Sequence, residues 1–360
     1  MKIKAKPAFE THEPVIHGGI LSKNTSFSGI LDFSSNVIPS AVPKGVKNTI
    51  KKQIKKISEY PDINSSKLLS ALKKYTKIPK SNLIIGNGAV EIIYNFCNAF
   101  LSRDTAVLIP IPTFGEYEVA SKLNDSKISF FKTFDLTKNL NSFISRIPKN
   151  GCIFICNPNN PTGKLILKKD LLQIIRKAKK LNSIVFVDEC FIELVPKSNE
   201  SIISYIKKFD NLIVLRTLTK SFGLAGIRIG YAASSKYIIS ILKKIKIPWS
   251  VNLLAEYAAI TALNNSSHIS KSNTIIDKEY NFLKNKIAKI NGFEPFESST
   301  NFILIKTTKD SSKLQKKLLE KKILVRDCKN FHGLNNHFIR IAIKSHKANI
   351  KLVSALKKLK

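Results

Sequence analysis

Short apolar runs alternate with helical patterns along the first two thirds of this chain, and each run ends at polar or glycine residues. The runs at 105–110, 152–156, 183–187 and 211–215 have the length and β-branched content of buried strands. Helical patterns lie between them, for example near 168–181. Repeated strand–helix units predict an α/β fold with a mostly parallel sheet and helices on both faces.

Four residues with side chains suited to ligand binding follow the ends of the predicted strands. They are Phe114, Asn160, Asp188 and Lys220. Ligands of such sheets collect beyond the carboxyl ends of the strands. We therefore expect these four side chains to converge on one crevice.

Lys220 lies in the stretch from Thr217 to Tyr231, directly after the predicted strand at 211–215. It stands between Thr219 and Ser221, and a glycine-containing turn and Arg228 follow. A lysine amine held there can condense with an aldehyde to form a Schiff base. A surface lysine is the simpler interpretation in so lysine-rich a chain, and only the predicted convergence favours a catalytic one.

A second glycine-containing turn, at 86–88, precedes a helical pattern with apolar residues at 89, 92, 93, 96, 97 and 100. Gly88 and Ala89 stand at the start of this predicted helix. The free N–H groups and the positive dipole end of a helix start suit a phosphate group. Taken alone this signal is weak, because glycine often precedes a helix.

The chain has a formal net charge of +35, which suggests an anionic substrate or nucleic acid. Its basic residues are spread over the whole length, and only seven of the 60 are arginine. A dedicated nucleic-acid surface more often clusters arginine and aromatic residues, so we expect no nucleic-acid partner. The seven arginines are Arg103, Arg146, Arg176, Arg216, Arg228, Arg326 and Arg340, and they mark the places where bidentate anion binding is expected.

Other features of the composition narrow the protein class. No apolar run reaches the roughly 18 residues of a membrane helix, so we expect a cytoplasmic protein without membrane contact. The five cysteines are scattered and lack metal-ligand spacing, which predicts buried reduced thiols and no metal site.

The order of the elements predicts an N-terminal arm over 1–44, a large domain over 45–247 and a small α+β domain over 248–360. Helices are expected at 44–57, 65–76, 235–246 and 252–263, and a polar stretch at 264–273 precedes a long helix that reaches about 290. Further strands are expected near 82–85, 302–306, 323–326 and 338–343.

Three motifs together resemble one enzyme family. They are N-P-N-N-P-T-G at 157–163, D-E at 188–189 and T-K-x-x-G-L-A-G-x-R-x-G at 219–230. In this order they are similar to the fold-type I enzymes of the aspartate-aminotransferase-like family (class I and II aminotransferases), which use pyridoxal 5′-phosphate. The resemblance covers nearly the whole chain. It implies a large domain with a mostly parallel sheet flanked by helices, and a smaller C-terminal α+β domain.

The resemblance also implies roles at the cofactor. Lys220 would hold the cofactor and move protons at the substrate's α-carbon, Asp188 would pair with the ring nitrogen, and Asn160 would bond the ring oxygen. Phe114 would stack on the ring. The cofactor phosphate would be bound by Gly88, Ala89, Thr219 and Arg228. Tyr60 is similar to the family tyrosine that reaches the phosphate of the neighbouring subunit, which implies a homodimer with shared active sites.

The two ends of the chain resemble one branch of this family. The segments His17-Gly18-Gly19, Asp32–Asn36 and Arg326–Leu334 are similar to enzymes that decarboxylate L-threonine O-3-phosphate to (R)-1-aminopropan-2-yl phosphate for the nucleotide loop of cobalamin. The alternative is a relative of that branch, an aminotransferase acting on histidinol phosphate or a related amino donor. By this resemblance, the small phosphorylated substrate would be bound by His17, Gly18, Asn36, Asn160, Arg326 and Arg340.

Phe191 bears on the choice between the two reactions. Aminotransferases of the family usually have at this position, three residues after the aspartate, a tyrosine that donates to the cofactor oxygen. Phenylalanine has no donor, so the electronic state of the cofactor is expected to differ. This favours an enzyme that does not transaminate, although the direction of the reaction depends on how the substrate is oriented. A third interpretation, a nucleic-acid-binding regulator on the same fold, needs an added module for which the chain has no spare residues.

Overall fold

A computed structural model describes residues 5, 7–10, 12–19, 29–38, 42–197, 199–265 and 267–359. Parts of the predicted arm at 1–44 therefore lie outside the described residues. Within the arm, the structure has a short helix, α1 (Pro7–Glu10), and a two-residue strand, β1 (Leu31–Asp32).

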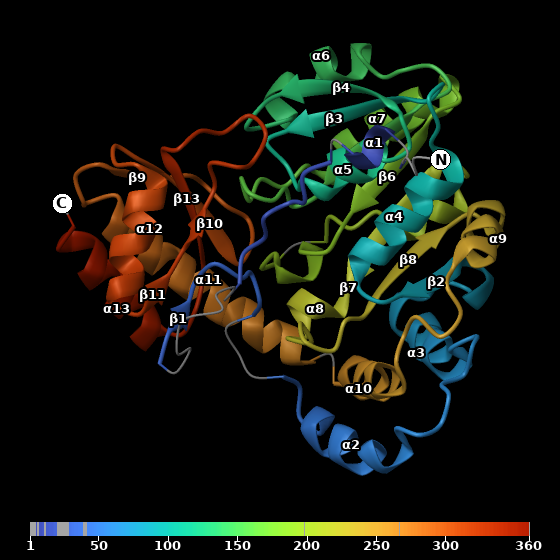
Figure 1. The fold of residues 1–360 in the computed structure, drawn as a ribbon, viewed down its shortest axis with the longest axis horizontal. Helices are drawn as coiled ribbons and strands as arrows, with labels where there is room; N and C mark the ends of the chain where they lie inside the picture. The colour runs from blue at the N-terminus through green and yellow to red at the C-terminus, as the bar shows by residue number, and fades with distance from the viewer. Residues whose placement is uncertain are drawn as a thin grey trace.

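A seven-stranded sheet forms the centre of the larger part of the molecule, drawn from blue through green to yellow in Figure 1. The strand order is β2-β8-β7-β6-β5-β3-β4. The run from β7 to β4 is parallel, whereas β8 is antiparallel to both β2 and β7. The sequence-based expectation of a mostly parallel sheet is thus confirmed. The strands are β2 (Leu83–Gly86), β3 (Ala106–Ile111), β4 (Lys127–Lys132), β5 (Cys152–Cys156), β6 (Ile184–Asp188), β7 (Leu212–Thr217) and β8 (Gly230–Ser234).

Helices cover both faces of this sheet because its strands are apolar on both sides. Along β5, Ile153 and Ile155 pack in a cluster with α2, α3, α6, α7 and α10. Cys152, Phe154 and Cys156 point the other way and pack with α4, α5 and α9. These helices are α2 (Val46–Gln53), α3 (Ser66–Thr76), α4 (Ala89–Phe100), α5 (Glu116–Lys122), α6 (Leu140–Ser145), α7 (Lys168–Lys180), α9 (Lys236–Ile245) and α10 (Leu253–Leu263).

Short turns of helix complete the larger part. They are α8 (Leu218–Ser221) and the 3-10 helices η1 (Ile54–Lys56), η2 (Lys80–Asn82), η3 (Thr137–Asn139), η4 (Ile192–Leu194) and η5 (Ile203–Lys207). Of these, α8 matters most for function, because it carries Lys220 directly beyond the end of β7.

A four-stranded antiparallel sheet with the order β12-β13-β10-β9 forms the smaller part, drawn in orange and red in Figure 1. Its core is an apolar cluster to which α11, α12 and α13 contribute. The elements are β9 (Phe293–Pro295), β10 (Phe302–Thr307), β12 (Arg326–Asp327), β13 (Phe338–Ala342), α11 (Ser267–Ile287), α12 (Ser311–Glu320) and α13 (His346–Lys357).

Two expectations from the sequence differ from the structure in this part. The predicted strand at 323–326 is two strands, because β11 (Ile323–Leu324) pairs with β1 of the arm and β12 pairs with β13. The long helix α11 begins at Ser267, inside the stretch 264–273 that we expected to precede it. The polar residues of that stretch are compatible with a helix because most of its side chains lie at the surface.

The helix α10 packs with the larger sheet, although it follows the domain boundary predicted at 247. Ala255, Ala258, Ala259 and Ala262 are buried in the cluster that also holds α3 and α7. We therefore propose that α10 belongs to the larger domain. The other domain limits stay predictions.

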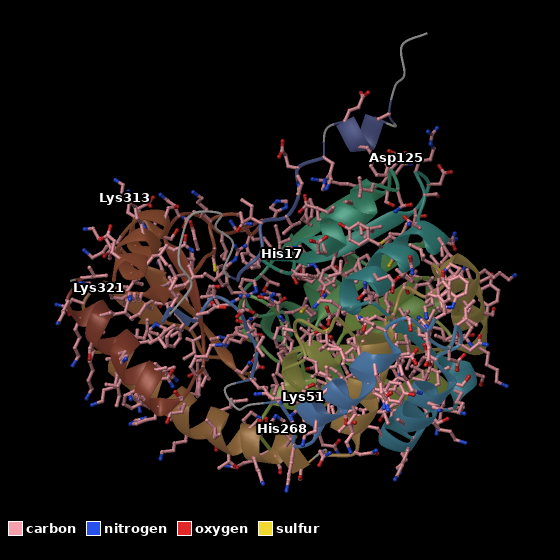
Figure 2. The ribbon with its side chains drawn as sticks, turned by 60° about the horizontal axis from the view of Figure 1, so that its bottom comes forward. His17, Lys51, Asp125, His268, Lys313 and Lys321 are labelled. Carbon is pink, nitrogen blue, oxygen red and sulfur yellow. The ribbon has the colours of Figure 1, made fainter. Side chains whose placement is uncertain are left out.

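The surface carries the excess lysine on many separate elements. Lys51 of α2, Lys313 of α12 and Lys321 are exposed; Lys51 lies on the larger part, and the other two lie on the smaller part (Figure 2). Within the described part of the chain, no helix combines the length and the apolar character needed to cross a bilayer.

Candidate active site

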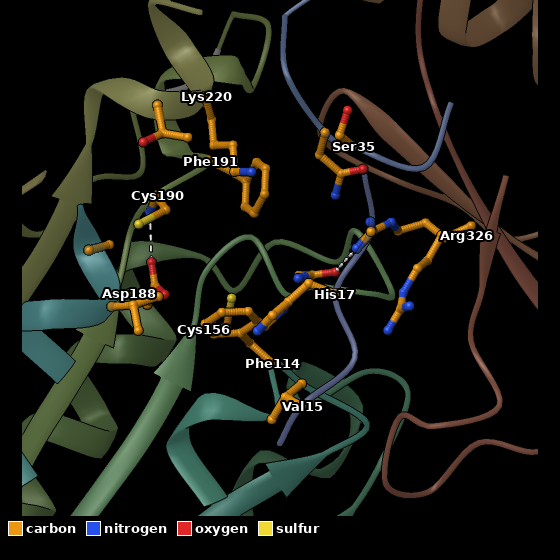
Figure 3. A pocket seen from close by; sticks show the side chains of 18 of the residues that line it. Val15, His17, Ser35, Phe114, Cys156, Asp188, Cys190, Phe191, Lys220 and Arg326 are labelled. Carbon is orange, nitrogen blue, oxygen red and sulfur yellow. Dashed lines mark hydrogen bonds between the residues drawn. The ribbon is translucent and has the colours of Figure 1, made fainter. Parts of the chain in front are cut away.

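One pocket lies beyond the carboxyl ends of β5, β6 and β7, where the larger sheet, the arm and the smaller domain meet. Figure 3 shows Lys220 and Phe191 on one side of it, Val15 on the opposite side and Arg326 reaching in from the smaller domain. Every predicted site residue except Gly88 and Tyr60 lines it. The lining residues are Val15, Ile16, His17, Gly18, Ser34, Ser35, Asn36, Ala89, Val90, Phe114, Gly115, Cys156, Asn160, Asp188, Cys190, Phe191, Thr217, Thr219, Lys220, Arg228, Arg326, Asn330, Phe331 and Arg340.

Lys220 reaches the pocket from α8, a single helical turn that begins where β7 ends. Thr217 caps this turn, because its hydroxyl accepts a hydrogen bond of 3.1 Å from the backbone N–H of Thr219. Burial first, and then the positive charge of Arg340, lower the pKa of the Lys220 amine to about 8. A substantial fraction of the amine is therefore neutral near physiological pH, which is the state in which it is a nucleophile.

Asp188 is the last residue of β6, and its carboxylate is buried in the pocket wall. Its Oδ2 accepts a 2.6 Å hydrogen bond from the hydroxyl of Tyr117, and its Oδ1 accepts one of 2.8 Å from the backbone N–H of Cys190. Burial raises the pKa of Asp188 in spite of these donors. A cationic group bound beside it would favour the ionised carboxylate.

The side chain of Glu189, the next residue, faces away from the pocket and takes part in a separate hydrogen-bond network. Its side chain accepts hydrogen bonds of 2.9 and 3.1 Å from the Arg216 guanidinium and one of 2.7 Å from the Ser201 hydroxyl. Neither Glu189 nor Arg216 lines the pocket. Of the D-E motif, only the aspartate therefore reaches the site.

At the start of α4, close approach of the backbone to Arg228 forms a corner whose groups suit an anion. Gly88 has a φ of 83°, and a Cβ there would lie 2.5 Å from Nη2 of Arg228. A Cβ on Gly230 would lie 2.6 Å from the backbone nitrogen of Ala89. The positive φ requires glycine at position 88, and the backbone of Ala89 requires it at position 230. Together they bring the helix start next to the Arg228 guanidinium, and Ala89, Arg228 and Thr219 all line the pocket.

Asn160 is the one asparagine of the 157–163 motif that lines the pocket. The Asn157 side chain instead bonds the backbone of Ile166, donating over 3.0 Å and accepting over 2.7 Å. Asn159 donates to a backbone carbonyl of the loop after β3. Because Oδ1 of Asn160 accepts a hydrogen bond from Arg340, its Nδ2 is left as a donor for a ligand.

Arg326 and Arg340 stand directly opposite each other on β12 and β13. Both are largely buried, and both line the pocket. Arg340 donates over 2.7 Å to the carbonyl of Ser34, and its Nε is buried without a hydrogen-bond partner among the described residues. Arg326 donates over 2.8 Å to Oδ1 of Asn330 and also to the carbonyl of Ile16. Two positive charges on one cross-strand pair repel each other, and bound anions would reduce this repulsion.

The arm supplies three of the predicted substrate residues. A Cβ on Gly18 would lie 2.5 Å from the carbonyl oxygen of Ser34, so the two arm segments touch here. Asn36 is buried, and its Oδ1 has no hydrogen-bond partner in the described residues. His17 lies beside Phe114, with 5.7 Å between the ring centroids, and its Nε2 is 2.6 Å from Oε1 of Glu116.

Tyr60 lies outside this pocket. Its side chain is 81% exposed, and its ring centroid is 4.9 Å from that of Trp249. Within one chain, Tyr60 is therefore not among the residues that line the pocket.

Several residues near the site were not identified from the sequence. Asp188 accepts a hydrogen bond from Tyr117, and His17 is bonded by Glu116, which accepts from Tyr94. These contacts join distant parts of the chain, and no motif marked the three residues that make them. Cys190 lines the pocket and is partly exposed, whereas the other four cysteines are buried and all five are free.

Comparison with known proteins places the chain in a family. The family model for aminotransferase class I and II matches residues 28–356. A histidinol-phosphate aminotransferase from Methanococcus aeolicus is 34% identical over 92% of this chain and 90% of its own. A putative threonine-phosphate decarboxylase from Caldanaerobacter subterraneus subsp. tengcongensis is 35% identical over 90% of this chain and 89% of its own.

Solved structures agree with this placement. The histidinol-phosphate aminotransferase from Clostridium acetobutylicum superimposes with a TM-score of 0.82 at 33% identity, covering 92% of this chain and 99% of its own. A histidinol-phosphate aminotransferase from Sinorhizobium meliloti has the same fold, with a TM-score of 0.76 at 20% identity over 90% of this chain and 89% of its own. That structure is a complex with pyridoxal-5′-phosphate.

The pocket fits this cofactor. The corner formed by Gly88, Gly230 and Arg228 suits a phosphate group, and the neutral form of Lys220 suits an aldehyde. Asp188 is a buried carboxylate whose ionised form needs a cationic neighbour, such as a protonated ring nitrogen. The chain therefore belongs to the class I and II aminotransferase family, whose members are pyridoxal 5′-phosphate-dependent enzymes with the aspartate-aminotransferase-like fold.

Proposed function

We propose that this enzyme decarboxylates L-threonine O-3-phosphate to (R)-1-aminopropan-2-yl phosphate. The observation that carries the proposal is the register pair of Arg326 and Arg340, both lining one pocket. Threonine phosphate brings a phosphate and a carboxylate on one small molecule, and each guanidinium can bind one of them in a bidentate manner. Histidinol phosphate has a phosphate but no carboxylate.

The contacts of the two arginines suggest which anion each binds. Arg340 bonds Asn160, which we propose as the donor to the cofactor's ring oxygen. An anion at Arg340 would then lie near the cofactor, as a carboxylate on the reacting carbon must. Arg326 is tied to the arm through the carbonyl of Ile16, so the phosphate would bind farther out, near His17. We propose that Gly18 and Asn36, which also line the pocket, contact the substrate as well.

The residues around the cofactor follow from the same geometry. When bound, pyridoxal phosphate supplies an electron-withdrawing ring that stabilises the electron pair left on the substrate's α-carbon. Asp188 would pair with the ring nitrogen, Phe114 would pack on the ring face, and Lys220 would hold the cofactor. The cofactor phosphate would be bound by Gly88, Ala89, Thr219 and Arg228.

The reaction then needs one bond broken and one proton returned. The bond between the α-carbon and the carboxylate breaks, CO₂ leaves, and a proton takes its place on that carbon. Lys220 can deliver this proton, because its pKa of about 8 lets it hold and release a proton near neutral pH. Arg340 would hold the carboxylate until it leaves.

Phe191 supports decarboxylation independently. It is buried, lines the pocket and packs edge-on against Phe302 with 5.1 Å between ring centroids. The phenyl ring cannot donate a hydrogen bond to the cofactor oxygen, unlike the tyrosine that is usual in the aminotransferases. Asn160 would then be the neighbouring donor to that oxygen.

The second candidate is an aminotransferase on histidinol phosphate or a related amino donor. It is favoured by the 34% identity with the Methanococcus aeolicus enzyme over most of both chains. In that reaction Lys220 would move a proton from the α-carbon, and the arginine pair would bind the phosphate of one substrate and the carboxylates of the other in turn.

One assay separates the two candidates. Purified protein with pyridoxal phosphate is incubated with L-threonine O-3-phosphate, and the release of CO₂ and of (R)-1-aminopropan-2-yl phosphate is measured. A parallel sample receives histidinol phosphate and 2-oxoglutarate. We expect product in the first sample. Product only in the second would reject decarboxylation and establish the aminotransferase.

We also propose a homodimer with shared active sites. Tyr60 is 81% exposed and packs against Trp249, which is itself exposed, and their sequence neighbours Ile57 and Ile247 are exposed as well. An apolar patch of this kind suits a second copy of the chain. Light scattering of the purified enzyme is expected to give twice the mass of one chain. A fully active monomer at assay concentration would contradict both the dimer and the role of Tyr60 in a neighbouring site.

A further inference from the structure

Glu116, the first residue of α5, has a buried carboxylate that bonds two side chains next to the pocket. Its Oε1 is 2.6 Å from Nε2 of His17, and its Oε2 accepts a 2.6 Å hydrogen bond from the Tyr94 hydroxyl. His17 lines the pocket, whereas Glu116 does not. Glu116 can therefore act on a ligand only through His17.

The proton positions in this group follow from its contacts. Burial and the hydrogen bond to Glu116 raise the pKa of Tyr94, so its hydroxyl stays a donor. Burial raises the pKa of Glu116, but hydrogen bonds from His17 and Tyr94 outweigh it and leave the pKa below its ordinary value. Glu116 is thus a carboxylate that accepts from both neighbours, and Nε2 of His17 carries a proton.

The second ring nitrogen decides what His17 offers a ligand. In a neutral imidazole protonated at Nε2, Nδ1 is an acceptor, which repels an anion; in an imidazolium, both nitrogens donate. With Nε2 held by Glu116, Nδ1 is the ring nitrogen of His17 that is left for a ligand in the pocket.

The arm is fixed on both sides of His17. A Cβ on Gly115 would lie 3.2 Å from the side chain of Val15, so Val15 packs directly onto the start of α5. The carbonyl of Ile16 accepts a 3.0 Å hydrogen bond from Asn330 of the smaller domain. Among the described residues, the contact between His17 and Glu116 is a polar contact of this segment with the larger domain, and it sets the position of the imidazole.

We infer that Glu116, oriented by Tyr94, is a positioning residue that holds the imidazole of His17 in the pocket for contact with the phosphate of the substrate. This rests on the proposed phosphorylated substrate. It adds to that proposal a residue outside the pocket on which recognition of the phosphate depends.

The test is Glu116→Gln in the full-length enzyme loaded with pyridoxal phosphate. Glutamine keeps the size of the side chain and a carbonyl oxygen for Tyr94, but it removes the negative charge. The KM for L-threonine O-3-phosphate is expected to rise about 10- to 100-fold, the loss of one charge-assisted hydrogen bond, while kcat changes by less than about threefold. A merely structural defect would instead lower kcat, cofactor content and the thermal midpoint together.

Glu118→Gln is the matched control. Glu118 lies on the same helix and also pairs with a histidine, since its Oε2 is 3.0 Å from Nδ1 of His332. Neither residue of that pair lines the pocket. The KM of the Glu118→Gln enzyme for L-threonine O-3-phosphate is expected to equal that of the wild type. An equal rise in KM for both variants would reject a specific role of Glu116.

A double-mutant cycle with His17→Asn completes the test. His17→Asn should raise KM by a similar factor, and adding Glu116→Gln to it should have little further effect, because the carboxylate then has no imidazole to hold. Independent, multiplying effects would overturn the inference, as would an unchanged KM in either single variant. If the wild type instead acts only on histidinol phosphate, the proposed decarboxylation fails, and the same cycle measured with that substrate still decides the role of Glu116.

Discussion

Lys220→Ala is expected to abolish turnover, lowering kcat by on the order of 10⁴-fold or more, because it removes both the covalent anchor of the cofactor and the group that moves the proton. Alanine leaves α8 intact, since its cap is the hydroxyl of Thr217. The measurements are the rate of CO₂ release and the visible absorbance that the cofactor has when it is bound to a lysine. Both should be lost, whereas the cofactor should still bind through the corner at Gly88 and Arg228.

Two controls make this result specific. Lys306→Ala removes an exposed lysine of β10 and is expected to leave activity unchanged. Added small primary amines should restore a fraction of the activity of Lys220→Ala, because they can enter the space left by the side chain and carry the proton. Wild-type turnover by Lys220→Ala would refute the assignment of this lysine.

The sequence was sufficient to predict Lys220, Asp188 and Asn160 because strand ends are local signals. Each of them follows a short apolar run whose limits are marked by polar or glycine residues. In a parallel sheet such ends meet on one edge, so their convergence follows from topology without any tertiary detail. The structure places all three on the wall of one pocket.

The contacts that tune these residues could not be predicted in the same way. Tyr117 bonds Asp188 across 71 positions of sequence, and Tyr94 bonds Glu116 across 22. A tyrosine on a buried helix face fits the apolar pattern as well as a phenylalanine does, and the pattern does not show where its hydroxyl points. Such pairs depend on how helices pack on the sheet, which is set by the whole core.

Antiparallel pairing was the other feature beyond the reach of the sequence. β8 begins at Gly230, inside the motif that contains Lys220, and it inserts antiparallel between β2 and β7. Its five residues are all buried and include two alanines, so neither alternation nor β-branched content marks them as a strand. The split of 323–326 into β11 and β12 has a similar cause, because each half finds its partner in a different part of the chain.

Asp188→Asn is expected to lower kcat by on the order of 10³-fold, because the amide keeps the shape of the side chain but loses the charge that pairs with the ring nitrogen. The one oxygen of asparagine can still accept from the backbone N–H of Cys190, and its amide nitrogen can donate to the Tyr117 hydroxyl, so the pocket wall should keep its form. The rate of CO₂ release measures the loss. Tyr117→Phe, which keeps the charge and removes one donor, is expected to cost about tenfold or less.

The stability of the cofactor-free protein separates this role from a structural one. Burial raises the pKa of Asp188, so the folded state favours the protonated carboxyl. The stability that this group contributes is present below its unfolded pKa and is lost as the pH rises through its folded pKa. At neutral pH the cofactor-free Asp188→Asn variant should therefore be at least as stable as the wild type, measured as the thermal midpoint. Adding pyridoxal phosphate should raise the midpoint more in the wild type, because only there does binding supply a partner for the buried charge. A cofactor-free variant that melts well below the wild type would instead mean that the carboxylate of Asp188 holds the fold together.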